Sequence, residues 1–97
     1  MLFELNDGLF EWDTEKERLN FEKHRVHFET AARVFRDENR IELYDEEHSD
    51  DEDRYNTIGK VEDVLFVVFT ERRERIRLIS ARIATPAERR MYHDSIL

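Results

Sequence analysis

The sequence contains no cysteine, one proline and two glycines among its 97 residues. Without cysteine, neither a disulfide framework nor a thiolate zinc site can form, which fits a reducing compartment such as the cytoplasm. The N-terminus, MLFELNDGLFEWD, lacks the basic segment and the long apolar run of a signal peptide. No stretch approaches the roughly 18 apolar residues that span a bilayer. We therefore expect a cytoplasmic protein that does not bind a membrane.

Apolar residues are also scarce, because 39% of the chain is hydrophobic and 41% is charged. At this length we expect one domain over residues 1–97, with a thin core formed by one sheet that is covered mainly on one face. Seven Phe, three Tyr and one Trp supply bulky apolar area for such a core.

The net charge of −8 is unevenly distributed along the chain. Residues 1–53 hold 18 acidic and 7 basic side chains, whereas residues 54–97 hold 6 acidic and 9 basic ones. Such asymmetry suits a protein that binds a phosphate ligand with one surface and a basic partner with another. The alternative is that the acidic residues only keep the chain in solution.

The N-terminal half predicts two helices. We expect residues 1–9 to be a loosely held extension and LFEW (9–12) to form a short strand. Thr14 and Glu17 have the spacing of a capping box, which opens a helix through about His24. HFETAARVFRDE (27–38) predicts a second helix. Its expected core stripe is Phe28, Ala31, Ala32 and Phe35.

The C-terminal half predicts strands and a last helix. RIELYD, RYNTIGK, VLFVVFT and RIRLISARIA are strand-like, and VLFVVFT predicts a central strand buried on both faces. The acidic run DEEHSDDEDR (45–54) favours a solvated loop. Thr85, Pro86 and Glu88 form a capping box with proline at the first helical position. The order predicts an α+β fold, in which an antiparallel sheet of about four strands and a short N-terminal strand pack with two N-terminal helices and one C-terminal helix.

Three blocks of this sequence, in order, resemble the BrnT toxin family. They are FEWDTEKERLNFEKHRVHFETAARVFRD, HSDDEDRYNTIG and RIRLISARIATPAERRMY, which together extend from about Phe10 to Tyr92. The resemblance implies a RelE-like fold and a ribonuclease toxin of a bacterial type II toxin–antitoxin system. It also implies a ribbon-helix-helix antitoxin of the BrnA type. DNA would be contacted by this antitoxin and not by the chain itself. One departure is Arg25, where the family usually has glycine. In a left-handed turn an arginine costs about 1 kcal/mol relative to glycine.

RNA cleavage requires neither a metal nor another cofactor, because the 2′-hydroxyl of RNA is itself the nucleophile. The reaction needs proton transfer and cations that stabilise charge on the phosphate. The residues that we expect to take part in catalysis are Lys23, His24, Arg77, Arg82 and Tyr92. Those that we expect to bind RNA are Lys16, Arg54, Arg75 and Arg89. In each case the alternative is structural: a solvated helix face for Lys16, Lys23 and His24, or a half-buried aromatic ring for Tyr92.

The late arginines pose a geometric problem. In a regular strand Arg75 and Arg77 share one face and Arg82 lies on the other, so only a bulge would place all three together. A guanidinium suits phosphate because its planar fork donates two parallel hydrogen bonds. The alternative is that Arg75 and Arg77 form ion pairs with Glu71 or Glu74 across a hairpin.

Two other functions are compatible with the sequence. A toxin-like scaffold without catalysis would act as a binding module for an antitoxin or regulatory partner. A metal-dependent nuclease would use His24 and His27 with Asp45, His48 and Asp50, although the two histidines fall at a helix boundary and the acidic run is flexible. We expect no metal, and we interpret HSDDEDR as an acidic patch for a basic partner.

Overall fold

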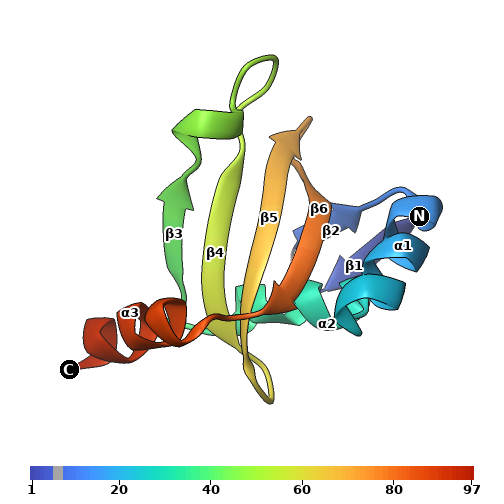
Figure 1. Ribbon diagram of the computed structural model, residues 1–97. Coiled ribbons are helices and arrows are strands. Elements are labelled where there is room, and N and C mark those ends of the chain that lie inside the picture. The colour runs from blue at the N-terminus through green and yellow to red at the C-terminus, as the bar shows by residue number, and fades with distance from the viewer. Residues whose placement is uncertain (6–7) are drawn as a thin grey trace.

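The computed structural model describes residues 1–5 and 8–97, and its strands form one six-stranded mixed sheet (Figure 1). The strands are β1 (Leu2–Leu5), β2 (Gly8–Glu11), β3 (Ile41–Tyr44), β4 (Tyr55–Lys60), β5 (Val64–Arg72) and β6 (Arg75–Ile83). The helices are α1 (Thr14–His24), α2 (Phe28–Arg33), α3 (Pro86–Ile96) and two short 3₁₀ turns, η1 (Val34–Arg36) and η2 (Glu46–His48). None of these helices is long and apolar enough to cross a bilayer.

The sheet has the order β1-β2-β6-β5-β4-β3. Strands β3 to β6 form the predicted antiparallel meander. The expected short N-terminal strand is β2, which pairs in parallel with β6 through Phe10–Ile76 and Glu11–Arg77. The α+β fold, the four antiparallel strands and the order of the elements are thus confirmed, and β1 is an additional strand.

The expectation that residues 1–9 are loosely held was wrong for the described part of that segment. Strands β1 and β2 pair in antiparallel fashion, and the N-terminal amino group donates a hydrogen bond of 2.8 Å to the carbonyl oxygen of Trp12. The ring of Phe3 packs against that of Trp12, with centroids 5.9 Å apart. Backbone pairing and this aromatic contact fix the segment, and residues 6–7 lie outside the described residues.

The main core lies on one face of the sheet, which α2 and η1 cover. Phe28, Ala31 and Ala32 are fully buried there, and Phe35 packs beside them, as predicted. On the other face, α3 covers one end, where Tyr92 packs with Ile58 and Val64. The rest of that face lacks a covering helix within the described residues, so Phe66 and Val68 of β5 are only half-buried. The prediction that β5 is buried on both faces was therefore only partly correct.

A β-bulge in β6 resolves the problem of the arginines. Val68 of β5 pairs with Ser80, but Phe69 pairs with Leu78, so Ile79 has no counterpart. Beyond the bulge the alternation of β6 is reversed. As a result Arg77, opposite Thr70, and Arg82, opposite Phe66, project on the same side of the sheet. We call this side, which carries Asn56, Phe66, Val68 and Ser80, the open face.

Helix α1 lies beside β6, beyond the point where β2 ends (Figure 1). The side chain of Asn20 substitutes for a neighbouring strand, because it donates to the Ala81 carbonyl (2.9 Å) and accepts from the Ala81 N–H (3.1 Å). The N-cap of α1 is Asp13 rather than Thr14, since the Asp13 carboxylate accepts from the backbone N–H groups of residues 15 and 16. Glu17 instead accepts from the N–H of Phe28, which ties the two helices together.

The start of α3 and the end of α1 both follow local rules. The predicted capping box of Thr85 and Glu88 is confirmed at the start of α3. At the end of α1, Arg25 adopts the left-handed conformation (φ 60°, ψ 28°) that the family's glycine would take, and its N–H closes the helix on the carbonyl of Phe21. The chain thus keeps this turn geometry with a residue for which it is strained.

Candidate functional site

The open face contains a groove of about 400 Å³ between η2 and the second half of β6. Half-buried Phe66 and Val68 form an apolar floor, and polar side chains surround it. The full lining is Asp45, Glu47, His48, Arg54, Asn56, Phe66, Val68, Ile79, Ser80 and Arg82. The Oδ1 atom of Asn56 is buried and has no hydrogen-bond partner. We call this cavity the open-face groove.

Arg82 is rigidly positioned at one end of the groove. Its guanidinium lies 4.2 Å from the centre of the Phe66 ring and forms two hydrogen bonds, of 2.7 and 2.9 Å, with the Glu88 carboxylate. These bonds lower the pKa of Glu88 despite its partial burial. Glu88 also belongs to the capping box of α3, so the start of this helix orients Arg82. Cation–π stacking and a bidentate carboxylate together restrict the guanidinium to one pose.

Arg54 occupies the other end, at the start of β4. No carboxylate lies within ion-pair distance of its guanidinium among the residues that the structure describes, so its charge is available to a ligand. The backbone N–H of Arg54 donates to Ser49 Oγ (2.9 Å), which connects it to the segment that carries His48. His48 in turn lies 3.0 Å from the Asp45 carboxylate through Nδ1. The sequence suggested His48 only as a metal ligand or as part of the acidic patch HSDDEDR, and its position inside an acidic run that ends at Arg54 was the one available signal.

Arg75 and Arg77 lie at the start of β6, outside the groove lining, and share one carboxylate. Glu11 of β2 lies 2.6 Å from Arg77 and 3.8 Å from Arg75. The alternative of ion pairs is therefore correct in kind, although the partner is Glu11 rather than Glu71 or Glu74. Arg75 also lines a second cavity of about 400 Å³ at the tip of the β5–β6 hairpin.

The basic residues of α1 lie near the arginines of β6 but do not line the groove. The pKa of His24 is lowered, mainly by burial and then by the charges of Lys23 and Arg82. The end of α1 therefore lies within electrostatic range of Arg82. At the other end of α1, backbone hydrogen bonds and then the charges of Lys16 and Arg77 lower the pKa of Asp13. Lys16 and Lys23 are exposed.

Tyr92 and Arg89 also lie outside the groove lining. Tyr92 is 3% exposed, and its hydroxyl donates a hydrogen bond of 2.5 Å to Asp37 Oδ2. Burial and this carboxylate raise the pKa of Tyr92 to about 12. The geometry is that of a structural link between α3 and the end of η1. Arg89, one turn earlier, is half-buried.

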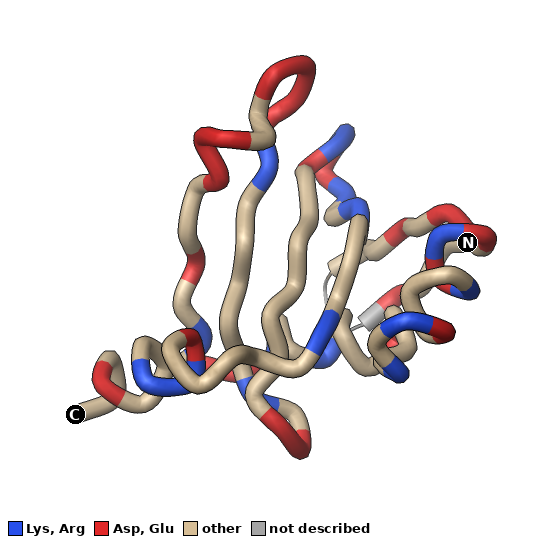
Figure 2. The backbone as a smooth tube through the Cα atoms, in the orientation of Figure 1, with Lys and Arg blue, Asp and Glu red and all other residues tan. Residues whose placement is uncertain are grey.

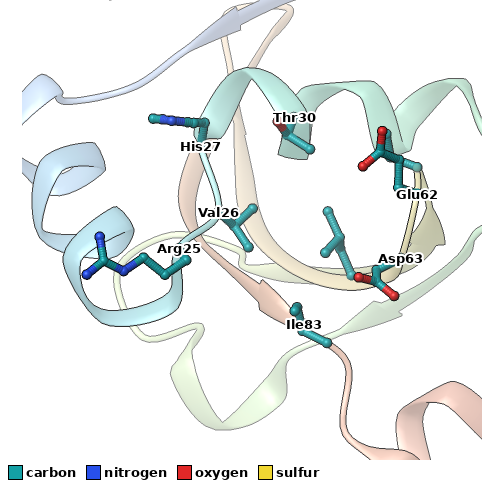
Figure 3. A pocket seen from close by; sticks show the side chains of 9 residues that line it. Arg25, Val26, His27, Thr30, Glu62, Asp63 and Ile83 are labelled. Carbon is teal, nitrogen blue, oxygen red and sulfur yellow. The ribbon is translucent and has the colours of Figure 1, made fainter.

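A third cavity, of about 240 Å³, lies between the α1–α2 turn and the β4–β5 turn (Figure 3). Arg25 and His27 lie on one side of it, and Glu62 and Asp63 lie on the other (Figure 3). It contains none of the predicted site residues. His27 stacks on Phe21 with centroids 4.0 Å apart. Across the described residues no three His, Cys, Asp or Glu side chains gather as a metal site would require, so the histidines and the acidic run do not converge.

Comparison with known proteins decides the family. The family model described as the ribonuclease toxin BrnT of type II toxin–antitoxin systems matches residues 12–88. This chain belongs to the BrnT family. The crystal structure of the Brucella abortus BrnT ribonuclease toxin shares its fold, with a TM-score of 0.61 and 20% identity over 78% of this chain and 95% of that one. Curated protein sequences gave no match. Membership of the BrnT family makes this chain a ribonuclease toxin whose partners are RNA and an antitoxin.

Proposed function

We propose that this BrnT-family protein is a metal-independent endoribonuclease. It binds RNA in the open-face groove and inhibits translation by cleaving it. The observation that carries the proposal is the groove itself, in which Arg54 and Arg82 stand at two ends of an apolar floor. Guanidinium groups bind phosphate oxygens, and the half-buried ring of Phe66, on which the Arg82 guanidinium stacks, adds apolar surface for a base. Two cations beside an apolar floor suit a ligand in which phosphates alternate with bases.

Cleavage in this groove needs no metal, because the RNA supplies its own nucleophile. The 2′-hydroxyl attacks the adjacent phosphorus, and a guanidinium stabilises the charge that grows on the phosphate oxygens. Arg54, with no carboxylate partner among the described residues, is the cation best able to do this. Arg82 is partly neutralised by Glu88, so we assign it to RNA binding and positioning. Lys16, Lys23 and Arg75 extend the basic surface beside the groove, and we assign Tyr92 to stability rather than to catalysis.

The acidic segment 45–53 is the surface that we propose for the antitoxin. Figure 2 shows its acidic residues gathered between β3 and β4, and Asp45 and Glu47 of this segment line the groove. Two contacts hold the segment against β5: Thr70 donates to the carbonyl of Asp53 (2.5 Å), and Arg72 pairs with Glu52 (3.0 Å). A basic antitoxin of the ribbon-helix-helix type bound there would block access to the groove, and DNA would be contacted by the antitoxin. We place this complex in the cytoplasm.

The test is RNA cleavage by the purified protein, freed of antitoxin, in EDTA and in Mg²⁺. We expect equal cleavage in both, with products that end in a 2′,3′-cyclic or 3′-phosphate. Arg54→Gln should reduce cleavage roughly 10²–10³-fold, because it removes the phosphate-stabilising donor. Arg90→Gln makes the same charge change at an exposed position of α3 and should have no effect. Intact RNA under both conditions would refute the proposal, and cleavage only with Mg²⁺ would refute metal independence.

A second candidate function, a binding module without catalysis, is favoured by the ion pairs of Arg77 and Arg82. Glu11 and Glu88 offset the charges of these two arginines, which weakens their attraction for phosphate. Induced expression distinguishes the two functions. Growth arrest that the neighbouring gene relieves indicates the nuclease, whereas tight antitoxin binding without growth arrest indicates the module.

A further inference from the structure

His48 and Asp45 form a carboxylate–imidazole pair at the Arg54 end of the open-face groove. The Nδ1 atom of His48 lies 3.0 and 3.2 Å from the two carboxylate oxygens of Asp45. The Asp45 side chain is only 15% exposed, whereas His48 is 59% exposed. A rather immobile carboxylate thus orients an imidazole that remains accessible to a ligand.

The segment that carries this pair is fixed to the start of β4. The Asp45 N–H donates to the carbonyl of Arg54 (2.9 Å), and Ser49 Oγ donates to the carbonyl of Asp45 (2.5 Å). Ser49 Oγ also accepts from the Arg54 N–H. These bonds hold His48 and Arg54 on one short connection, so a phosphate bound by Arg54 lies at the end of the groove that His48 lines.

We propose that His48, oriented by Asp45, accepts the proton of the attacking 2′-hydroxyl. This inference rests on the proposed nuclease function and assigns its proton-transfer residue. An ionised carboxylate only accepts hydrogen bonds, so Nδ1 carries the hydrogen and Nε2 keeps the lone pair that a base needs. From the sequence we expected His24 to take part in catalysis, but His24 lies at the end of α1 and does not line the groove.

The reaction balances with groups that are present. The 2′-oxygen forms a bond to phosphorus, and its proton moves to Nε2 of His48. The bond from phosphorus to the 5′-oxygen breaks, and that oxygen takes a proton from water. The products are a 2′,3′-cyclic phosphate and a 5′-hydroxyl, and His48 then returns its proton to water. Arg54 supplies the positive charge beside the phosphate throughout.

The experiment compares cleavage rates with RNA binding in four proteins: wild type, His48→Ala, His24→Ala and the control His93→Ala, which alters an exposed histidine of α3. Binding is measured with an oligonucleotide that lacks 2′-hydroxyls and therefore cannot be cleaved. We expect His48→Ala to lose roughly 10²–10⁴-fold in rate, to bind the oligonucleotide like wild type, and to regain activity with added imidazole. His93→Ala should match wild type.

The pH profile supplies an independent readout. The rate of wild type should rise with pH as the base loses its proton, and His48→Ala should lack this rising limb. The charged groups that face His48 are Asp45, Glu47, Arg54 and Arg82. Asp45→Asn removes the orienting carboxylate and should lower the cleavage rate without abolishing it. The inference is overturned if His48→Ala cleaves at the wild-type rate, or if its loss equals its loss of binding. A wild-type protein without activity would instead refute the nuclease function on which the inference rests.

Discussion

Replacing Tyr92 by phenylalanine separates a structural role of this side chain from the catalytic role that the sequence predicts. The variant keeps the ring in its apolar cluster and removes only the hydroxyl, which donates a 2.5 Å hydrogen bond to Asp37. Asp37 retains two donors, the backbone N–H groups of Lys60 (2.7 Å) and Asn39 (2.9 Å). Hydrogen bonds to charged groups contribute about 1.5–3 kcal/mol, so we expect the free energy of unfolding to fall by about 2 kcal/mol. In a domain of this size that lowers the melting temperature by roughly 8–16 °C.

The assay pairs thermal unfolding with RNA cleavage on the same preparation, at a temperature where both proteins are folded. We expect cleavage at the wild-type rate. Tyr44→Phe is the matched control, because it removes a tyrosine–aspartate hydrogen bond, Tyr44 to Asp53, from a side chain that is half exposed. Its effect on stability should be much smaller. Unchanged stability with greatly reduced cleavage in Tyr92→Phe would refute the structural assignment.

The pH dependence of the same variant follows from Asp37. Burial alone would raise the pKa of Asp37, but hydrogen bonds from Tyr92 and from the N–H groups of Lys60 and Asn39 outweigh it, so the pKa is lowered from 3.8. A carboxyl with a depressed folded-state pKa stabilises the fold above its unfolded value and loses that contribution as pH falls through the folded value. The stability difference between wild type and Tyr92→Phe should therefore be largest above pH 3.8 and narrow below it.

Three further substitutions, one of them with a matched control, test local features of the fold by urea denaturation. Arg25→Gly should stabilise by about 1 kcal/mol, because the left-handed conformation suits glycine, whereas Lys23→Gly in the helix before it should destabilise by about as much. Gly59→Ala should cost about 1–3 kcal/mol, since its Cβ would lie 2.6 Å from Val34 Cγ1 in a packed core; no loss would mean that η1 moves freely. Asn20→Ala should cost about 2 kcal/mol or more, because it leaves buried backbone groups of β6 without partners, and a neutral result would contradict that role.

The parts of the fold that the sequence predicted depend on neighbours in the chain. The start of α3 rests on contacts between Thr85 and Glu88, three positions apart, and residue types at fixed spacing are enough to recognise it. The meander of β3 to β6 likewise follows from apolar runs joined by short turns. The N-cap of α1 shows the limit of such patterns, because Asp13 and Thr14 are both good capping residues and only the backbone geometry distinguishes them.

The site depends on contacts that no local pattern specifies. Glu11 and Arg77 are 66 positions apart, and Tyr92 and Asp37 are 55 apart. Alternation in β6 correctly indicated that only a bulge could place Arg77 and Arg82 together, but the irregular position, Ile79, became visible only in the pairing with β5. His48 differs, because its partner Asp45 lies only three positions away, yet the residue types alone do not reveal this contact or the groove. Its chemistry comes from contacts with Asp45 and from the groove, whereas its sequence context is simply acidic.

The parallel pairing of β2 with β6 has a consequence for how the chain refolds. Strands β4, β5 and β6 close short loops, whereas β2 must find β6 across more than sixty positions and gains only two residue pairs there. Closing a long loop delays such a contact, so the N-terminal hairpin should dock after the meander has formed. In the folded protein this edge should also open first, with amide hydrogens of β2 exchanging with solvent well before those of β5.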